Sequence, residues 1–384
     1  MIQRRNLKRF LGKSFTQPGY AFKVFTKRLR AYAAYRLRSG RSSYPESLTM
    51  FLTNRCNLRC KMCGQWGDGG ITKRYASSII QSEIALDKLY SLIDDIFFFK
   101  PNITLFGGEP LLYGNCIELI SYIKQKRMHC LMITNGTLLT EKANEIVASG
   151  LDELNVSLDG AGDLHDQIRG MPGLFAKITS GLRCIHDIKK RNSYNKPYIN
   201  LQCAISRYNY TELEELIGVA EETFADSLTF HNLIFINSET LERQKKYDSF
   251  LNCESTAWEG FISEPGIDPA ILYNKMDKIL SKQYPFRVEF YPNFSYQGLR
   301  DYYNRAIYFP PEYKARCLSP WVVAYIFPDG EVRPCLNSSY SYGNIKKDRL
   351  TKLWNNEKAV KFRLWLKKNK LFPVCCRCTE LYRY

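Results

Sequence analysis

Short apolar runs alternate with helical patterns along the chain from residue 48 onward. The apolar runs, which we expect to be strands, lie at 48–53, 102–106, 129–133, 154–158, 198–205 and 228–236. The helical patterns between them lie at 83–99, 112–127, 140–149, 174–190 and 210–223. This alternation favours parallel βα units with right-handed crossovers. It predicts an α/β fold, a partial (β/α)6 barrel of the TIM type in which the loops after the strands carry the chemistry.

The remaining chain follows other patterns. Residues 237–316 are rich in aromatic side chains, and apolar alternation at 286–291 predicts one further strand. A Pro-Asp-Gly turn at 328–330 predicts a β-hairpin, and a helical pattern follows at 349–368. We therefore expect four segments: a basic amphipathic extension (1–47), the barrel (48–236), a bridging region beside the substrate cavity (237–316) and a small α+β domain (317–384).

The net charge of +17 is concentrated near the N-terminus. Residues 1–45 carry twelve Lys and Arg and no acid, so the rest of the chain sums to only +5 (17 − 12). Positions 20–39 have the pattern of a basic amphipathic helix. We expect residues 1–42 to dock on an anionic membrane surface. A nucleic-acid arm, which we consider the weaker reading, and a helix that packs on the protein body are the alternatives.

The hydrophobic content of 45% supports a large core. The sequence has no run of 18 apolar residues, and no apolar h-region follows the basic N-terminus. We therefore expect a cytoplasmic protein, peripheral at the inner membrane face if the basic helix docks there. In a reducing cytosol, clustered cysteines among the thirteen indicate metal binding rather than disulfides.

Three cysteines follow the first expected strand with the spacing C-x₃-C-x₂-C, at Cys56, Cys60 and Cys63. Three thiolates hold three irons of a cubane [4Fe–4S] cluster and leave the fourth iron open to a ligand. A structural zinc site would need a fourth local ligand, and three buried thiols without a metal are the simplest alternative. The spacing favours the cluster.

Residues 51–63 resemble the cluster loop of radical S-adenosylmethionine (radical SAM) enzymes, although Met62 stands where that family usually has an aromatic residue. The resemblance extends over 48–236 and implies SAM binding at the ends of later strands. A Gly-Gly-Glu-Pro segment at 107–110 is similar to the family's GGE motif, whose segment binds the SAM amino group. The implied cofactor-binding residues are Gly107, Gly108, Glu109, Thr134, Asn135, Ser157, Asp159 and Arg169.

Two of these residues also have an ordinary structural interpretation. In relatives, the serine and the arginine help to hold the SAM ribose or carboxylate, and the guanidinium fork of arginine suits a carboxylate. Turn formation and capping are the alternative for Ser157 and Asp159.

A second cysteine set lies at Cys317, Cys335, Cys375 and Cys378. It resembles the twitch domain, a shortened SPASM domain with one auxiliary [4Fe–4S] cluster. Cys376 is an alternative to Cys375 as ligand, and a zinc ribbon is the alternative site. A cluster with four thiolates has no open iron, so it suits electron transfer better than substrate binding.

The resemblance implies an enzyme that cleaves SAM to a 5′-deoxyadenosyl radical, using an electron from a flavodoxin- or ferredoxin-type reductant. The basic tail favours a lipid-linked, glycan-type or phosphorylated substrate, and the auxiliary cluster favours a net oxidation. A ribosomal-peptide maturase is the alternative, and an iron–sulfur electron carrier or a zinc-stabilised nucleic-acid-binding protein are alternatives of other classes. The sequence marks no acid–base group. His231 is a candidate, although a lone histidine is more often a satisfied core residue.

Overall fold

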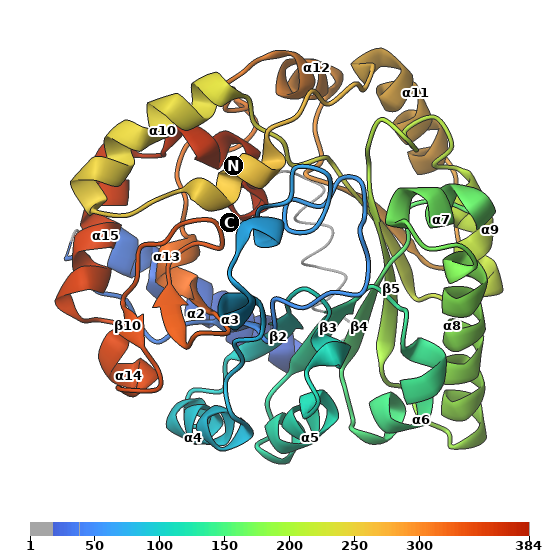
Figure 1. The fold of residues 1–384 in the computed structure, drawn as a ribbon, viewed down its shortest axis with the longest axis horizontal. Coiled ribbons are helices and arrows are strands. Elements are labelled where there is room, and N and C mark those ends of the chain that lie inside the picture. Colours follow the sequence, from blue (N-terminus) through green and yellow to red (C-terminus); the bar gives the residue numbers. More distant parts are fainter. Residues whose placement is uncertain (1–17, 38, 384) are drawn as a thin grey trace.

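The computed structural model describes residues 18–37 and 39–383. Within these residues the strands form one ten-stranded sheet in the order β10-β9-β8-β1-β2-β3-β4-β5-β6-β7 (Figure 1). The neighbours from β8 through β1 to β7 run parallel, and β9 and β10 add an antiparallel edge. The strands are β1 (Ser47–Phe51), β2 (Asn102–Phe106), β3 (Cys130–Thr134), β4 (Glu153–Ser157), β5 (Tyr198–Ala204), β6 (Ser227–His231), β7 (Arg287–Tyr291), β8 (Val323–Ile326), β9 (Glu331–Arg333) and β10 (Gly343–Asn344).

Helices cover the outer face of the parallel strands (Figure 1). The helices between strands β1 and β6 are α3 (Ser77–Ile80), α4 (Leu86–Ile96), α5 (Cys116–Gln125), α6 (Leu139–Ala148), α7 (Gly162–Arg169), α8 (Leu174–Arg191) and α9 (Glu215–Glu222). The later ones are α10 (Ser238–Leu251), α11 (Pro269–Leu280), α12 (Tyr296–Asn304), α13 (Ser319–Val322), α14 (Leu350–Leu353) and α15 (Glu357–Asn369). Short 3₁₀ turns are η1 (Ile71–Arg74), η2 (Pro110–Leu112), η3 (Thr256–Phe261), η4 (Pro373–Arg377) and η5 (Thr379–Tyr382). The predicted α/β partial barrel is confirmed.

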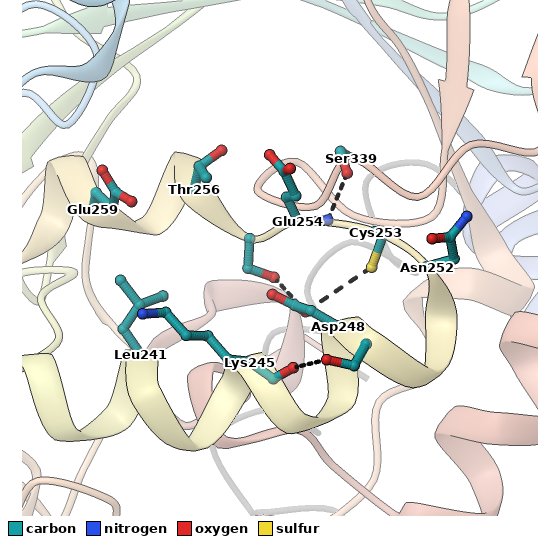
Figure 2. Close-up of a pocket in the computed structure, with 11 residues that line it drawn as sticks. Leu241, Lys245, Asp248, Asn252, Cys253, Glu254, Thr256, Glu259 and Ser339 are labelled. Carbon is teal, nitrogen blue, oxygen red and sulfur yellow. Dashed lines mark hydrogen bonds between the residues drawn. The ribbon is translucent and has the colours of Figure 1, made fainter.

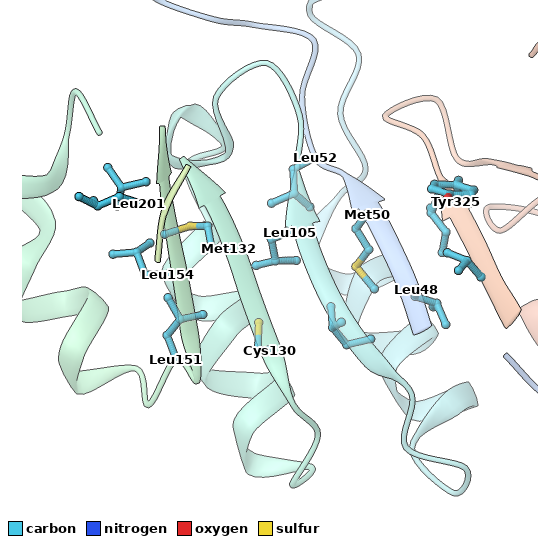
Figure 3. Close-up of a cluster of buried hydrophobic side chains, with 14 of the residues drawn as sticks. Leu48, Met50, Leu52, Leu105, Cys130, Met132, Leu151, Leu154, Leu201 and Tyr325 are labelled. Atoms are coloured by element: carbon cyan, nitrogen blue, oxygen red, sulfur yellow. The ribbon is translucent and has the colours of Figure 1, made fainter. Parts of the chain in front are cut away.

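The outer face of the sheet is apolar because alternate residues of each strand point toward the helices. Leu48, Met50, Leu105, Met132 and Leu154 are at most 1% exposed and belong to one core cluster (Figure 3). Helix α4 contributes a matching stripe, since its buried residues recur at intervals of three and four. Burial of this two-layer interface is the main source of stability of the barrel.

The inner face is polar where a closed barrel would hold layers of apolar side chains. Residues paired in parallel strands lie on the same face, so the strand register defines rows across the inner wall. One row runs through Ser157, Gln202, Thr229 and Glu289, and the next brings His231 beside Tyr291. The wall therefore offers hydrogen-bonding groups rather than a packed core.

The sheet continues on both sides of the six predicted strands. The alternation at 286–291 forms β7, which pairs with β6. On the other side, β8 pairs parallel with β1, Ser47 lying opposite Val323. The predicted hairpin forms between β8 and β9, so the C-terminal part extends the barrel sheet.

The predicted N-terminal helix forms as α2 (Pro18–Arg36) and packs on the protein body. The Tyr35 and Trp321 rings meet edge to face at 5.1 Å, and Arg28 pairs with the buried Glu46 at 3.1 Å. Residues 1–17 and residue 38 of the predicted membrane-binding extension (1–42) lie outside the described residues. No helix in the described part is long and apolar enough to cross a membrane.

Candidate iron–sulfur sites

The loop after β1 carries the three motif cysteines, and one nitrogen lies near each sulfur. Asn135 Nδ2 is 3.8 Å from Cys56 Sγ, Arg169 Nη1 is 3.8 Å from Cys60 Sγ, and the Trp66 backbone N–H donates to Cys63 Sγ at 3.4 Å. Asn135 follows β3 and Arg169 ends α7, so loops at the carboxyl ends of different strands converge on the sulfurs. Such outer contacts orient and tune the ligands of an iron–sulfur cluster.

The cysteine loop is folded tightly on itself. Cys63 N–H donates to the Cys60 carbonyl at 3.0 Å, and Gly67 N–H donates to the Cys63 carbonyl at 2.8 Å. A Cβ on Gly67 would lie 2.6 Å and 2.7 Å from the carbonyl oxygens of Cys63 and Cys60, a distance that requires the loop to shift. Glycine at this position therefore keeps the thiols close together.

The three thiols affect one another's ionisation. Burial raises the pKa of Cys60 to about 11, the Arg169 guanidinium acts against that shift, and the Cys63 and Cys56 sulfurs add to it. Burial also raises the pKa of Cys56. Because metals bind thiolates, a cluster must displace these protons when it assembles.

The Gly107-Gly108 segment approaches protein backbone rather than open space. Gly108 N–H donates to the Thr53 carbonyl at 2.8 Å, and a Cβ on Gly108 would lie 2.1 Å from the Arg55 carbonyl oxygen. We expected these glycines to admit a ligand. They let the β2 loop lie against the start of the cysteine loop, and their part in SAM binding stays a prediction.

Glu109 ties the β2 loop to the β3 loop. Its carboxylate accepts from Leu111 N–H (3.1 Å), the Thr134 hydroxyl (2.8 Å) and Asn135 N–H (2.7 Å). Burial raises the pKa of Glu109 to about 7, and the three donors act in the opposite direction. Glu109 and Thr134 thus position Asn135, whose amide faces Cys56.

Asp159 holds Arg169 in place at the site. The buried Asp159 carboxylate lies 2.6 Å from Arg169 Nε, and it accepts from Ala204 N–H at 2.8 Å. Burial would lower the pKa of Arg169, but the Asp159 carboxylate reverses this and raises it. Burial and Arg169 lower the pKa of His165 to about 3, so its Nδ1 stays free of a proton and accepts from Asp159 N–H at 3.0 Å.

Two predicted residues lie on the inner wall at the same end of the barrel. Ser157 is partly exposed, and its hydroxyl makes no hydrogen bond to any described residue. His231 is also partly exposed, and its ring meets Tyr291 edge to face at 5.7 Å. Tyr291 in turn donates to the Thr379 carbonyl at 2.6 Å, one residue beyond Cys378.

The second cysteine set surrounds an enclosed cavity of about 100 Å³. Cys317, Cys335, Cys375 and Cys378 all line it, and its wall is mainly apolar. Cys376 points elsewhere, its sulfur lying 4.0 Å from the Ala306 carbonyl oxygen. Burial raises the pKa of Cys378 to about 12 and that of Cys317 well above its usual range. Four buried thiols around one cavity fit an auxiliary cluster with four protein ligands.

A fifth cysteine, Cys253, lines the same cavity and escaped the sequence analysis because it belongs to no spaced motif. Its thiol lies 3.8 Å from the Ser338 hydroxyl and 3.9 Å from the Asp248 carboxylate. Cys253 also lines a more open cavity of about 520 Å³ between α10, η3 and Ser339 (Figure 2). It therefore stands between the cysteine-lined cavity and the surface.

Neither cysteine set converges on a point. In the described part of the chain, no group of three or more His, Cys, Asp or Glu side chains is arranged to hold a single metal ion. A cubane cluster binds each thiolate at a separate iron, so its ligands need not meet at one centre.

Comparison with known proteins agrees with this geometry. The family model described as "Radical SAM superfamily" matches residues 50–219, and the model described as "Iron-sulfur cluster-binding domain" (SPASM) matches residues 317–379. The chain belongs to the radical SAM superfamily and carries a C-terminal SPASM domain. These two domains imply a SAM-binding [4Fe–4S] cluster, an auxiliary cluster and SAM itself as cofactors.

Curated radical SAM relatives match this chain over different lengths. Fe-coproporphyrin III synthase of Methanosarcina barkeri is 30% identical over 48% of this chain, which spans only 43% of that protein. The tungsten-containing aldehyde ferredoxin oxidoreductase cofactor-modifying protein of Pyrococcus furiosus is 25% identical, covering 86% of both chains. The antilisterial bacteriocin subtilosin biosynthesis protein AlbA of Bacillus subtilis is 23% identical over 88% of this chain and 66% of its own.

The radical SAM fold is also evident in solved structures. Streptococcus suis SuiB bound to S-adenosylmethionine superposes with a TM-score of 0.60 at 12% identity, covering 87% of this chain and 71% of SuiB. At this identity the likeness concerns the fold alone.

Proposed function

We propose that this protein cleaves SAM reductively and uses the resulting 5′-deoxyadenosyl radical to abstract hydrogen from a substrate. The main support is the convergence of three elements on the three thiols, one nitrogen approaching each sulfur. A cluster bound by Cys56, Cys60 and Cys63 would supply an open iron for SAM and the electron that splits its C5′–S bond.

The chain's own residues position SAM and its surroundings. We assign Arg169, which Asp159 holds in place, and the unpaired hydroxyl of Ser157 to the polar groups of SAM. Thr134 and Glu109 fix the backbone of the loop that carries Asn135 beside the cysteines. We also assign the backbone of Gly107 and Gly108, which lies against Thr53 and Arg55 at the start of the cysteine loop, to the border of the SAM site.

A peptide is the substrate class that we favour. AlbA, which matches most of this chain, is named for subtilosin biosynthesis, and SuiB, which shares the fold, has been solved with its precursor peptide SuiA. The polar inner wall offers Gln202, Thr229 and Glu289 for hydrogen bonds to backbone amides. His231 remains the candidate acid–base group because it adjoins this wall.

A lipid-linked, glycan-type or phosphorylated metabolite, changed by net oxidation, is the second candidate. The basic extension favours it, and the fully ligated auxiliary site would suit removal of an electron from a substrate radical. Deuterated candidate substrates would distinguish the two classes, because deuterium appears in 5′-deoxyadenosine only when the true substrate is supplied.

Cleavage of SAM is the direct test. Radical SAM enzymes need an external reductant, for which we propose a flavodoxin or ferredoxin and would substitute dithionite in the assay. Anaerobically reconstituted protein should bind about eight irons and release 5′-deoxyadenosine from SAM. Colourless protein that binds zinc, or iron-loaded protein that leaves SAM intact, would refute the proposal.

A further inference from the structure

One end of the barrel exposes aromatic side chains. All helix-to-strand turns of a parallel sheet meet at the amino ends of the strands, and we call this end the strand-start face. Its exposed aromatic residues are 43% to 58% accessible to solvent: Tyr44 before β1, Phe97 and Phe98 after α4, Tyr194 before β5 and Phe224 before β6. Tyr44 packs edge to face on Phe98 at 5.2 Å, which holds these rings in place at the surface.

The strand-start face is also basic. Lys100, Arg127, Lys190 and Arg191 lie in or beside the same turns, and none of them forms an ion pair with a described residue. Three acids at this end are paired: Asp94 with Lys126, Asp226 with Lys189, and the buried Asp152 with Lys124 and Lys196. The exposed Asp187 and Glu221, near the ends of α8 and α9, form no ion pair with a described residue. The turns themselves, at 97–101, 126–129, 149–152, 192–197 and 223–226, carry four Lys or Arg and two Asp, so their net charge is positive.

The turns keep these side chains at positions that favour glycine. Lys100, Arg127 and Phe224 have φ values of 44°, 56° and 55°, in the left-handed region. The corresponding turn between α6 and β4 uses Gly150, with φ 75°. The left-handed backbone is unfavourable for lysine, arginine and phenylalanine, so their side chains are retained there against a conformational cost.

Helix α2 adjoins this face. The Lys27 ammonium group donates to the carbonyl oxygens of Phe99 at 2.9 Å and Lys100 at 3.0 Å. Next to it in sequence, Phe25 and Leu29 are 50% and 56% exposed. The basic extension thus reaches the body of the protein at the strand-start face.

We propose that the strand-start face docks on an anionic membrane surface. Aromatic side chains favour the membrane–water interface, and clustered cations are attracted to anionic headgroups. The cysteine loop, the β3 loop and Asp159 lie at the opposite, carboxyl ends of the strands. The docked protein therefore presents its SAM site to the solution, where a peptide can reach it. This inference does not depend on the proposed chemistry.

The test is co-sedimentation of the full-length protein with vesicles of phosphatidylcholine alone or with added phosphatidylserine. Wild-type protein should bind only the vesicles that contain phosphatidylserine, and added salt should weaken binding. In K100G/R127G, glycine suits both backbone conformations, so the variant should fold well and still lose about tenfold or more of its partition coefficient. F97S/F98S should lower binding by about tenfold through lost interfacial aromatics.

The matched control is K346Q/K347Q, which removes two exposed charges beside the 328–330 turn at the other end of the sheet. It should bind like wild type. Equal binding to both vesicle types, or an equal loss in this control and in K100G/R127G, would overturn the proposal. So would RNA binding or dimer formation that depends on the strand-start face without vesicle binding, because either outcome would assign the face to a different partner.

Discussion

The two cysteine sites of this protein differ in the groups that surround the cysteine sulfurs. Around the first set, one nitrogen approaches each thiol: Asn135 and Arg169 come from other parts of the fold, and the Trp66 N–H belongs to the cysteine loop itself. Polar residues of the inner barrel wall lie at the same end of the strands. The second set lines a small, enclosed and mainly apolar cavity with more thiols than a cubane has irons. The first arrangement offers polar partners for a ligand beside a bound cluster, whereas the second would surround a bound cluster with thiols.

This difference shows how one chain can hold two clusters for two tasks. An iron with an open position needs neighbouring groups that bind and orient its ligand. A cluster with four thiolates needs only burial and a fixed geometry to serve as an electron carrier.

The largest expected effect is on iron content and SAM cleavage, which should respond differently to loss of a cysteine at each site. C335A should lose about half of the iron, falling from about eight to about four irons per chain, because one auxiliary ligand is missing. It should still cleave SAM, whereas C60A should lose a similar amount of iron together with all SAM cleavage. Iron analysis and chromatography of 5′-deoxyadenosine measure both, and a C335A protein that no longer cleaves SAM would show that the sites are not independent.

The next effect concerns the buried ion pair at the first site. D159N should destabilise the protein by about 3–5 kcal/mol, because it leaves the Arg169 guanidinium buried without its carboxylate. The control is D163N, which alters an exposed acid on α7, the helix that carries Arg169. It should change stability little. Denaturant unfolding measures both variants, and equal stabilities would mean that the pair does not position Arg169.

A smaller effect should appear in the pH dependence of stability. Burial raises the pKa of Glu109 to about 7 from 4.5, so the folded state retains a proton that the unfolded chain has released. The free energy of unfolding should therefore fall by about 3 kcal/mol as the pH rises from 4.5 to about 7. E109Q should remove this slope and the exposed-site control E118Q should keep it; an unchanged slope in E109Q would contradict the assignment.

The smallest effect concerns the neighbouring cysteines at the second site. C375A should lose auxiliary iron, while C376A should keep it and lose at most about 1 kcal/mol of stability for a small cavity. Iron analysis of both variants shows which cysteine is the ligand. Loss of iron in C376A but not in C375A would mean that Cys376, and not Cys375, binds the auxiliary cluster.

Local patterns were sufficient to predict much of this molecule. The six strands, the further strand at 286–291 and the 328–330 hairpin followed from apolar periodicity and turn chemistry. The parallel pairing of β8 with β1 did not, because it joins residues far apart in sequence, and no local signal encodes such a pairing.

The same limit applied within the sites. Spacing marked the cysteines that share a motif, but Cys253 reaches the second cavity only through the tertiary fold. Sequence also could not show that Gly108 approaches the Arg55 carbonyl. That Arg169 is held by Asp159 is visible only in the folded protein, since the two residues lie ten positions apart in the chain.

The central claim is that only the cluster at the first cysteine set has an iron open to SAM. Its most direct test is electron paramagnetic resonance of the reduced protein with and without SAM. If only the first site has an open iron, SAM should change the signal of wild type and of C335A. It should leave the signal of the C56A/C60A/C63A variant unchanged. A signal from the triple variant that responds to SAM, or a C335A signal that does not, would contradict the account.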